Sequence, residues 1–570
     1  LTKGLSVHGS IAYDSYYYSR KKYSKTFPYY LARRDAEDPD YIYLIPQSEE
    51  SIWSVSTGWD KNRKVYMEFG IDYNRTFGLH KTTALILYNQ SKYYSPSLQY
   101  YVPNAYQGLV GRLTYEYASR YLAEFNMGYN GTENFAKGKR FGFFPAVSLG
   151  WVISEEKFFP KNNIVKYLKV RGSYGEVGND QIGGDRFLYL PSSYGAASDS
   201  GVNKYNFGLA SNPYTSLMIV ENKIGNPDLT WEKAKKMNVG VDINLFNNCL
   251  TASFDIFKEK RNNILANRST SPMIIGANLP AYNFGEMENR GWEMDLNFRH
   301  HIQDFHYWAR FNYSFARNEI IYMDEVQKRY DYQMTTGRRK NQFFGLIFDG
   351  YYNSWEEINA LDRPKSSWSG NQLQPGDVKY VDVNQDGVID DYDMVPIGYT
   401  PVPEIIYGFS FGAQYKGFDF SILFQGADNV SIKYFGRSMW PFAKGEESAK
   451  SLIKERWTQE RYEAGEKITF PRLSLNPNGE TDHNYRPSTL WIRDASYLRL
   501  KNLEVGYTFT GGFVKRLNLN SVRLYFNGSN LFTWTDVVDL DPEAPSRSGN
   551  VEINTYPLQK VYNIGLNINF

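Results

Sequence analysis

The chain has 570 residues, 64 of them basic and 62 acidic, and its formal net charge of +2 argues against nucleic acid or another polyanion as a partner. It contains no run of about 18 apolar residues, which excludes a membrane-spanning helix. The single cysteine, Cys249, excludes an internal disulfide framework, and we expect it to be an inert packing residue at a strand start.

Aromatic residues are unusually frequent, at 17% of the chain, with 48 tyrosines and 36 phenylalanines. Mean hydropathy is nevertheless low, at -0.54. A transmembrane β-barrel combines these two properties, because half of each strand faces water and aromatic girdles mark the membrane interfaces. A large secreted β-protein is the alternative.

Segments in which apolar and polar residues alternate recur along the whole chain, from a first strand expected at 5–13. The period of two is that of a β-strand with one apolar and one polar face. Each segment is close to the roughly 9–11 residues that a tilted strand needs to cross a bilayer, and we expect roughly sixteen strands in all. Clear examples are 65–73, 123–130, 237–245, 292–299, 305–313 and 407–414.

The connections between these segments alternate between short and long. Short ones are Asn247-Asn248, 301–303 and Lys416-Gly417. This asymmetry is typical of an outer-membrane barrel with short periplasmic turns and long extracellular loops, so both ends of the chain should lie on the periplasmic side. Long connections are expected near 14–62, 178–233, 318–402, 428–490 and 534–556, with a helix in 444–463.

The last ten residues alternate strictly and end on an aromatic residue. Tyr562, Ile564, Leu566 and Ile568 share one face with the terminal Phe570. A terminal strand of this kind resembles the signal that bacterial outer-membrane proteins present to the barrel assembly machinery. We therefore expect an all-β, transmembrane antiparallel barrel in contact with outer-membrane lipid, with Phe570 as its assembly signal.

One stretch carries a chemical motif. In 382–393, oxygen-bearing side chains occupy the positions of an EF-hand-type calcium loop, with Gly387 at the sharp turn. Position 12 carries an aspartate in place of the usual glutamate. The spacing predicts a structural calcium that stiffens the 318–402 loop, and the alternative is an acidic surface turn. The expected ligands are Asp382, Asn384, Asp386, the carbonyl of Val388, and Asp393.

Two other polar groups invite a functional interpretation. His300 and His301 lie at a short turn with His306 nearby, and we expect solvated histidines rather than a metal site. Glu155-Glu156 follows a strand, and we expect solvated charges rather than paired catalytic acids. The sequence shows no nucleophile elbow, phosphate-binding loop or zinc-spaced cluster, so no enzymatic activity is expected.

Several stretches resemble the SusC/RagA family of TonB-dependent outer-membrane transporters of Bacteroidota. One is Asn226-Pro227-Asp228-Leu229-Thr230-Trp231-Glu232, and another is Leu168-Lys169-Val170-Arg171-Gly172-Ser173-Tyr174-Gly175. Each match is short, but together they lie in order and cover nearly the whole chain. The others are 140–151, 154–159, 178–180, 238–242, 289–293, 375–377, 497–502, 530–533 and the terminal strand.

This resemblance implies a 22-stranded barrel with an N-terminal plug, of which residues 1–570 would be the C-terminal part of the barrel. The plug and the first strands are not in the sequence, so the chain is expected to be a fragment. The resemblance further implies active import of a large oligosaccharide or oligopeptide in the bacterial outer membrane. A SusD-like surface lipoprotein would be the partner, and the TonB–ExbB–ExbD complex would act through the missing part.

Two alternatives to active import remain open at this stage. The first is a passive porin-like or autotransporter-type channel, because a sixteen-stranded barrel could close on its own. The second is a secreted β-rich protein that binds or hydrolyses glycans, which predicts solubility without detergent and a set of convergent carboxylates.

Overall fold

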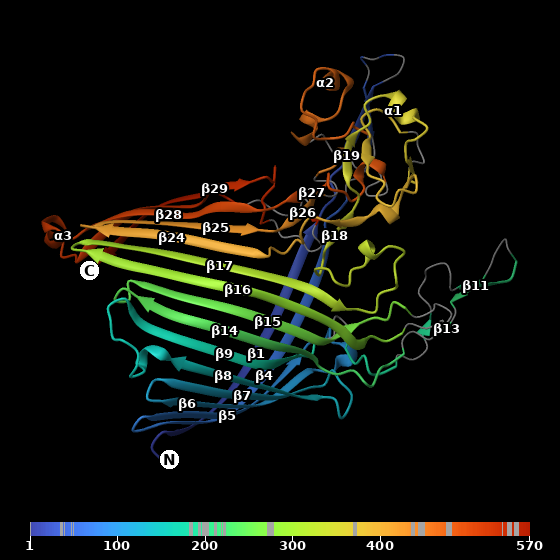
Figure 1. The fold of residues 1–570 in the computed structure, drawn as a ribbon. Helices are drawn as coiled ribbons and strands as arrows, with labels where there is room; N and C mark the ends of the chain where they lie inside the picture. Colours follow the sequence, from blue (N-terminus) through green and yellow to red (C-terminus); the bar gives the residue numbers. More distant parts are fainter. Residues whose placement is uncertain are drawn as a thin grey trace.

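Sixteen strands form one antiparallel sheet in the computed structural model, and each strand pairs with the next sheet strand along the chain (Figure 1). The predicted strand number and antiparallel order are thus confirmed. The strands are β1 (Leu5–Ser24), β4 (Ser54–Phe77), β5 (His80–Tyr94), β6 (Asn104–Tyr117), β7 (Tyr121–Thr132), β8 (Phe141–Val152), β9 (Val165–Asn179), β14 (Glu232–Leu245), β15 (Leu250–Ala266), β16 (Tyr282–Ile302), β17 (Phe305–Tyr322), β24 (Ile405–Tyr415), β25 (Phe418–Asp428), β28 (Tyr497–Phe509), β29 (Ser521–Thr535) and β31 (Val561–Asn569).

The structure describes most of the chain. The described residues are 2–34, 38, 40, 42–46, 48, 51–181, 186–191, 195–196, 204–209, 214–217, 219–220, 224–270, 279–368, 373–434, 439–442, 451–474, 482–538, 540–543, 550–551 and 558–570. None of the helices within these ranges is long and apolar enough to cross a membrane.

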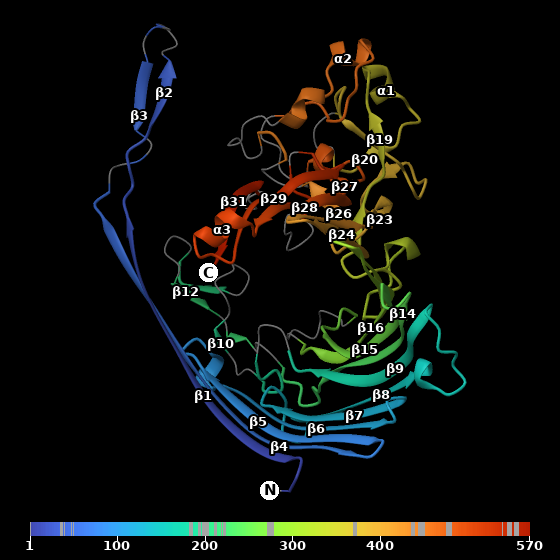
Figure 2. The same ribbon diagram turned by 90° about the vertical axis from the view of Figure 1, so that its left-hand side faces the viewer.

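The sheet curves around a wide central space, with β1 and β31 as its two edge strands (Figure 2). Its two faces differ as the period-two pattern predicts. On one face, register aligns Val239, Ile256, Trp292 and Phe315 across β14–β17. Ile256 on this apolar face is 57% exposed, which is the surface that lipid covers in a membrane barrel.

The opposite face is polar and points to the central space. Register aligns Arg171, Asp255, Glu293 and Ser314 across β9, β15, β16 and β17. An alternation of apolar and polar rows over neighbouring strands distinguishes lipid-facing from lumen-facing residues in a transmembrane barrel.

The remaining elements belong to the connections, and most lie at one end of the sheet (Figure 1). Helix α3 and both chain ends lie at the other. The shorter strands are β2 (Tyr30–Arg34), β3 (Ile42–Pro46), β10 (Gly195–Ala196), β11 (Lys204–Phe207), β12 (Tyr214–Leu217), β13 (Ile219–Val220), β18 (Phe343–Gly345), β19 (Phe348–Tyr351), β20 (Lys365–Ser366), β21 (Val378–Tyr380), β22 (Val388–Ile389), β23 (Val395–Ile397), β26 (Ser431–Tyr434), β27 (Ile492–Asp494) and β30 (Asn550–Val551). The α-helices are α1 (Trp355–Asn359), α2 (Gln459–Glu463) and α3 (Gly512–Arg516), and 3-10 turns occur at Gln99–Tyr101, Ile153–Glu155, Asp331–Gln333, Asp391–Asp393, Ser451–Glu455 and His483–Tyr485.

Two regions differ from the sequence prediction. Strand β1 continues from Tyr13 to Ser24 and pairs with β4 over that whole length, so the 14–62 connection is much shorter than expected. The helix expected in 444–463 is found only as the turn Ser451–Glu455 and helix α2, while residues 444–450 lie outside the described residues.

Candidate functional site

Long connections that follow β17, β25 and β29 fold together. We call them the extracellular assembly, after the side on which the alternation of short and long connections predicts them to lie; it comprises residues 323–404, 429–496 and 536–560 as far as they are described. Its sheet joins β26 to β27 and β30. Among the described residues, the largest cluster of buried apolar side chains lies in this assembly. It contains Leu346, Tyr351, Val378, Tyr380, Ile389, Val430, Ile432, Tyr434, Met439, Trp440, Trp457, Phe470, Tyr485, Leu490, Trp491, Ala495 and Val537.

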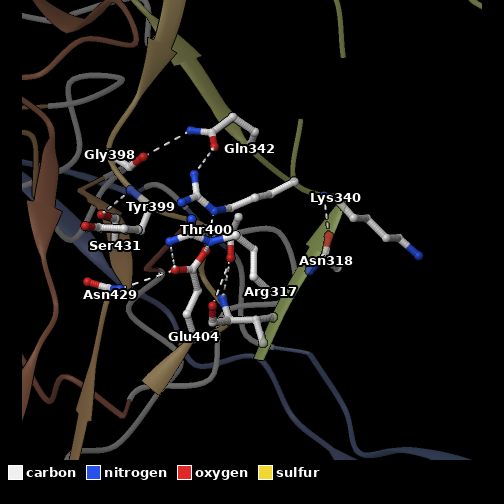
Figure 3. Close-up of polar contacts among 12 residues, drawn as sticks. Arg317, Asn318, Lys340, Gln342, Gly398, Tyr399, Thr400, Glu404, Asn429 and Ser431 are labelled. Carbon is white, nitrogen blue, oxygen red and sulfur yellow. Dashed lines mark hydrogen bonds and ion pairs between the residues drawn. The ribbon is translucent and has the colours of Figure 1, made fainter. Parts of the chain in front are cut away.

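Glu404 ties this assembly to the barrel, just before β24 begins (Figure 3). Arg317 at the end of β17 donates from Nε and Nη2 to the two carboxylate oxygens, at 3.0 and 2.8 Å. Arg339 donates to the same carboxylate, and Asn429 adds a contact at 3.3 Å. Because Glu404 is only 5% exposed, these bonds compensate for the burial of its charge.

The predicted calcium loop is an ordered turn in this assembly. Asp382 accepts hydrogen bonds from the backbone N–H of Asp386 and Gly387, at 3.3 and 2.8 Å. Asn384 Oδ1 accepts from the Asp386 N–H at 3.0 Å. Gly387 adopts φ +82°, a conformation that glycine tolerates best. The structure therefore brings three of the expected ligand side chains onto one tight loop.

Asp393, the expected twelfth ligand, closes the loop through the backbone. Its Oδ1 accepts from Val383 N–H at 2.8 Å, and its Oδ2 accepts from Asp390 N–H at 2.9 Å. Burial raises the pKa of this carboxyl, although the backbone donors act in the opposite direction. Asp393 is fully buried beside the loop and is also part of a capping box.

The carbonyl of Val388, the fifth expected ligand, lies on β22. The neighbouring carbonyls of Gly387 and Ile389 accept hydrogen bonds from Lys365 and Ser367 N–H, at 2.9 and 3.0 Å. Successive carbonyls alternate along a strand, so that of Val388 points away from this partner. No group of three or more His, Cys, Asp or Glu side chains arranged for a metal occurs among the described residues, so a cation here needs amide and carbonyl oxygens as well.

The polar lumen contains a charged cluster that sequence reasoning did not single out. Arg171 donates to both carboxylate oxygens of Asp255, each at 2.7 Å, and to Asp242 at 3.1 Å. Gly240 lies between them, where a Cβ would come within 2.5 Å of Asp255 Oδ1. A luminal recess of about 670 Å³ extends from Arg171 along β5–β9.

The other sequence candidates lie at the opposite, short-turn end. The rings of His301 and His306 face each other across the β16–β17 turn, with centroids 5.5 Å apart. Cys249 directly precedes β15, as expected. Phe570 is 86% exposed directly after β31, and Asn520 Nδ2 donates to its carbonyl at 2.6 Å.

The prediction that Glu155 and Glu156 are both solvated was wrong for Glu156. Its side chain is only 11% exposed and accepts hydrogen bonds from Tyr121 Oη and Trp151 Nε1, at 2.5 and 3.0 Å. The turn after β8 places Glu156 beside Tyr121 and Trp151, and both aromatic side chains direct their polar atom toward its carboxylate. Glu155 remains exposed and pairs with Lys161 at 3.6 Å.

Comparison with known proteins agrees with this geometry. The family profile described as "TonB dependent receptor-like, beta-barrel" matches residues 2–531. TonB-dependent receptor P3 of Formosa agariphila is 28% identical over 479 residues, which cover 81% of this chain and 45% of that protein. TonB-dependent receptor SusC of Bacteroides thetaiotaomicron is 28% identical over 477 residues, covering 83% and 44%. The chain thus spans less than half the length of these relatives.

Solved structures show the same fold. The RagAB peptide transporter superposes with a TM-score of 0.72 at 20% identity, over all of this chain and 60% of that chain. The RagAB peptide importer in its "open-open" state gives a TM-score of 0.73, with the same identity and coverage. With the profile match over most of its length, the chain belongs to the TonB-dependent receptor β-barrel family of the bacterial outer membrane.

Proposed function

We propose that the full protein imports a large nutrient actively across the outer membrane, with energy supplied through TonB. The single observation that carries this proposal is the family match over residues 2–531, which coincides with a lumen-facing polar wall. The chain itself supplies that wall and the extracellular assembly, and it catalyses no reaction in this proposal. A passive porin-like channel is the second candidate, since its lumen would also be polar.

The substrate class is a glycan or a peptide, and a SusD-like surface lipoprotein is the proposed partner. Relatives include a protein named SusC, and the solved structures of similar fold include one described as a peptide transporter. The extracellular assembly offers a lipoprotein a folded surface at the end of the sheet that bears the long connections (Figure 1). The TonB–ExbB–ExbD complex would act through the plug expected in the full protein.

Uptake by cells separates active import from passive diffusion. Cells that express the full protein are given labelled oligosaccharides and oligopeptides, and accumulation is compared with a deletion of its gene and with a deletion of tonB. Active import predicts that both deletions abolish uptake of one substrate class. Uptake that persists without TonB would support the porin-like channel.

Purification in mild detergent should recover a lipoprotein partner, identified by mass spectrometry.

We also propose that the 382–393 loop holds one structural calcium ion. The donor set supports this proposal, because Asp382, Asn384 and Asp386 provide hard oxygens on a turn that already exists. The carbonyl of Val388 is directed away from β20, and Asp393 lies against the same turn. Calcium would supply only charge compensation and rigidity.

The loop is also attached to the rest of the assembly, so its rigidity affects other segments. Tyr332 Oη and Gln333 Nε2 donate to the carbonyls of Tyr392 and Asp391, at 2.6 and 2.7 Å.

Calcium bound to the purified full protein can be counted by elemental mass spectrometry. Asp386→Asn should lose it, while Asp391→Asn, an exposed neighbour outside the ligand set, should keep it. Equal calcium content in both variants would contradict the proposal.

A further inference from the structure

The outward surface of β1, β4 and β5 carries basic side chains near the end of the sheet that bears the long connections. Arg63 of β4 lies in register with Ser15 of β1 and Tyr94 of β5. Lys92 of β5 is in register with Val65, the next outward residue of β4 on the side of the apolar face. Lys61, the next outward residue of β4 on the other side of Arg63, is in register with Tyr17 of β1. Lys21 follows on β1. We call Lys21, Lys61, Arg63 and Lys92 the basic collar.

Strand periodicity places this collar on the lipid-facing side. Along β4 the four side chains Ile71, Phe69, Met67 and Val65 alternate onto the same face and lead directly to Arg63. Ile71, Phe69 and Met67 are 38%, 52% and 40% exposed, as expected for an apolar surface that lipid covers. The collar therefore begins where the apolar face ends.

No acidic residue shares this face. Over residues 5–23, 55–73 and 82–94, every acidic side chain has the opposite parity and faces the lumen. These acidic residues are Asp14, Asp60, Glu68 and Asp72. The contact of His8 with Asp72, at 2.9 Å, occurs on that luminal side. Within these ranges, the charged side chains on the outer surface of the three strands are therefore all basic.

The charges of the collar are not neutralised within the described part of the chain. All four side chains are exposed, and none of them forms an ion pair with a described carboxylate. The Arg63 guanidinium lies over the Tyr94 ring, 4.6 Å from its centroid, which holds it on the outer surface.

A second group of outward lysines, on β15, is different. Lys258 pairs with Glu288 of β16 at 2.8 Å, and Lys260 pairs with Glu286 at 2.8 Å. Lys258 and Lys260 thus each have a carboxylate on the neighbouring strand, whereas the exposed Lys235 and Arg290 on the same face form no ion pair with a described carboxylate. The β1–β5 side differs because no acidic residue shares its outer face.

Aromatic side chains mark the collar as a membrane interface. Tyr17 and Trp59 point outward beside Lys61, with ring centroids 5.9 Å apart, and are 62% and 66% exposed. Tyrosine and tryptophan favour the headgroup level of a membrane, where one end of the ring is apolar and the other is wet. Lysine and arginine at the same level bind phosphate through charge-assisted hydrogen bonds.

We propose that the basic collar binds the phosphorylated headgroup of a glycolipid of the lipid A class in the outer leaflet. The acyl chains lie along the apolar face of β1, β4 and β5, and the phosphates contact Lys61, Arg63 and Lys92. This inference depends on outer-membrane location and not on the transported substrate, so its failure leaves the import proposal untouched.

Native mass spectrometry of the purified, delipidated full protein tests this proposal. The protein is titrated with bisphosphorylated lipid A and with lipid A from which both phosphates have been removed. The double variant Lys61→Gln with Arg63→Gln should bind the phosphorylated lipid at least about tenfold more weakly. The control Lys258→Gln with Lys260→Gln removes the same charge from the neutralised pairs and should change binding less than about twofold.

Three results would overturn the assignment. The first is equal binding of phosphorylated and dephosphorylated lipid, which would make the acyl chains the sole determinant. The second is an unchanged affinity of the collar variant. The third is an equal loss in the control variant, which would reduce the effect to bulk charge. Hydrogen exchange of the sheet strands, measured on both double variants, is the control that each retains the folded sheet.

Discussion

Arg499 of β28 and Asp541 of the connection after β29 form an ion pair at 2.8 Å, and Arg499 is only 1% exposed. The same guanidinium donates to Glu543 and, through Nε, to Thr533 at 2.9 Å. Tyr497 Oη and Gln425 Nε2 of the barrel wall also donate to Glu543, at 2.7 and 3.2 Å, so the last long connection is attached to the wall by a cluster around this buried cation.

Removal of that cation should release this connection. Arg499→Met leaves Asp541 and Glu543 without their main partner, and we expect the opening free energy of residues 536–543 to fall by about 3 kcal/mol. Native-state hydrogen exchange of this segment measures the change. Lys501→Met is the matched control, because Lys501 contacts Glu543 at 3.7 Å from a more exposed position and should cost less than about 1 kcal/mol.

Neutralising Glu404 should loosen the segment that leads into the extracellular assembly. In Glu404→Gln, Arg317 and Arg339 lose their shared carboxylate and repel each other. Limited trypsin digestion should then cut after Lys340 or Arg339 at least about tenfold faster, the equivalent of about 1.4 kcal/mol. Asn429→Ala removes only the contact at 3.3 Å and should accelerate cleavage far less. Equal rates in both variants would contradict the role of the charge.

Trp491 should be the most sensitive apolar position of the assembly. It is 2% exposed, packs on Phe470 and Tyr485 with ring centroids 5.5 and 5.4 Å away, and donates from Nε1 to the Asn484 carbonyl at 2.9 Å. Trp491→Ala should destabilise the assembly by about 3–5 kcal/mol while β5–β9 keep their hydrogen-exchange protection. Trp355→Ala, at a half-exposed site in helix α1, should have little effect.

Acidification should weaken the assembly through His483. Burial lowers the pKa of His483 below its ordinary value of 6.5, despite the hydrogen bond of Nε2 to the Val378 carbonyl at 2.8 Å. The folded state then binds fewer protons than the unfolded state, so this contribution is complete above about pH 6.5 and is lost as pH falls through the lower folded pKa. The ionisable groups around it are Asp377, Tyr380, Asp482 and Arg486.

Hydrogen exchange of residues 482–491 between pH 8 and 5, corrected for the intrinsic exchange rate, measures this dependence. His483→Gln should remove the part of the pH dependence that belongs to the imidazole. An unchanged pH profile in that variant would contradict the role of His483. Asp482 cannot replace it as the cause, because burial raises the pKa of Asp482 and its protonation on acidification acts in the opposite direction.

The sheet could be predicted from sequence because lipid and water act on alternate residues. Over 237–245 each apolar residue faces outward and each polar residue faces the lumen, so the period of two is strong. The pattern fades after Tyr13, where Tyr16, Tyr17 and Tyr18 follow each other, and the strand was predicted eleven residues too short. Beyond the membrane both faces of the strand meet water, so apolar and polar residues need not alternate. The period of two therefore no longer predicts the strand there.

The calcium-type loop was also visible in the sequence, since its ligands lie within twelve consecutive positions. The Glu404 cluster was not, because its arginines lie 87 and 65 residues away. A single glutamate after a proline carries no signal of such partners. The same holds for Arg171, whose carboxylate partners lie 71 and 84 residues away on other strands.

The main apolar cluster lies in the extracellular assembly and not in the sheet. The two parts of the chain are therefore stabilised in two different solvents, the sheet in lipid and the assembly in water. The sheet depends on lipid to cover residues such as Ile256, whereas the assembly around Trp440 and Trp491 excludes water by itself. Urea and detergent exchange should therefore denature the two parts independently. Sequence change in the connections is then free of the constraint that the membrane imposes on the strands, so new binding surfaces can arise on an unchanged barrel wall.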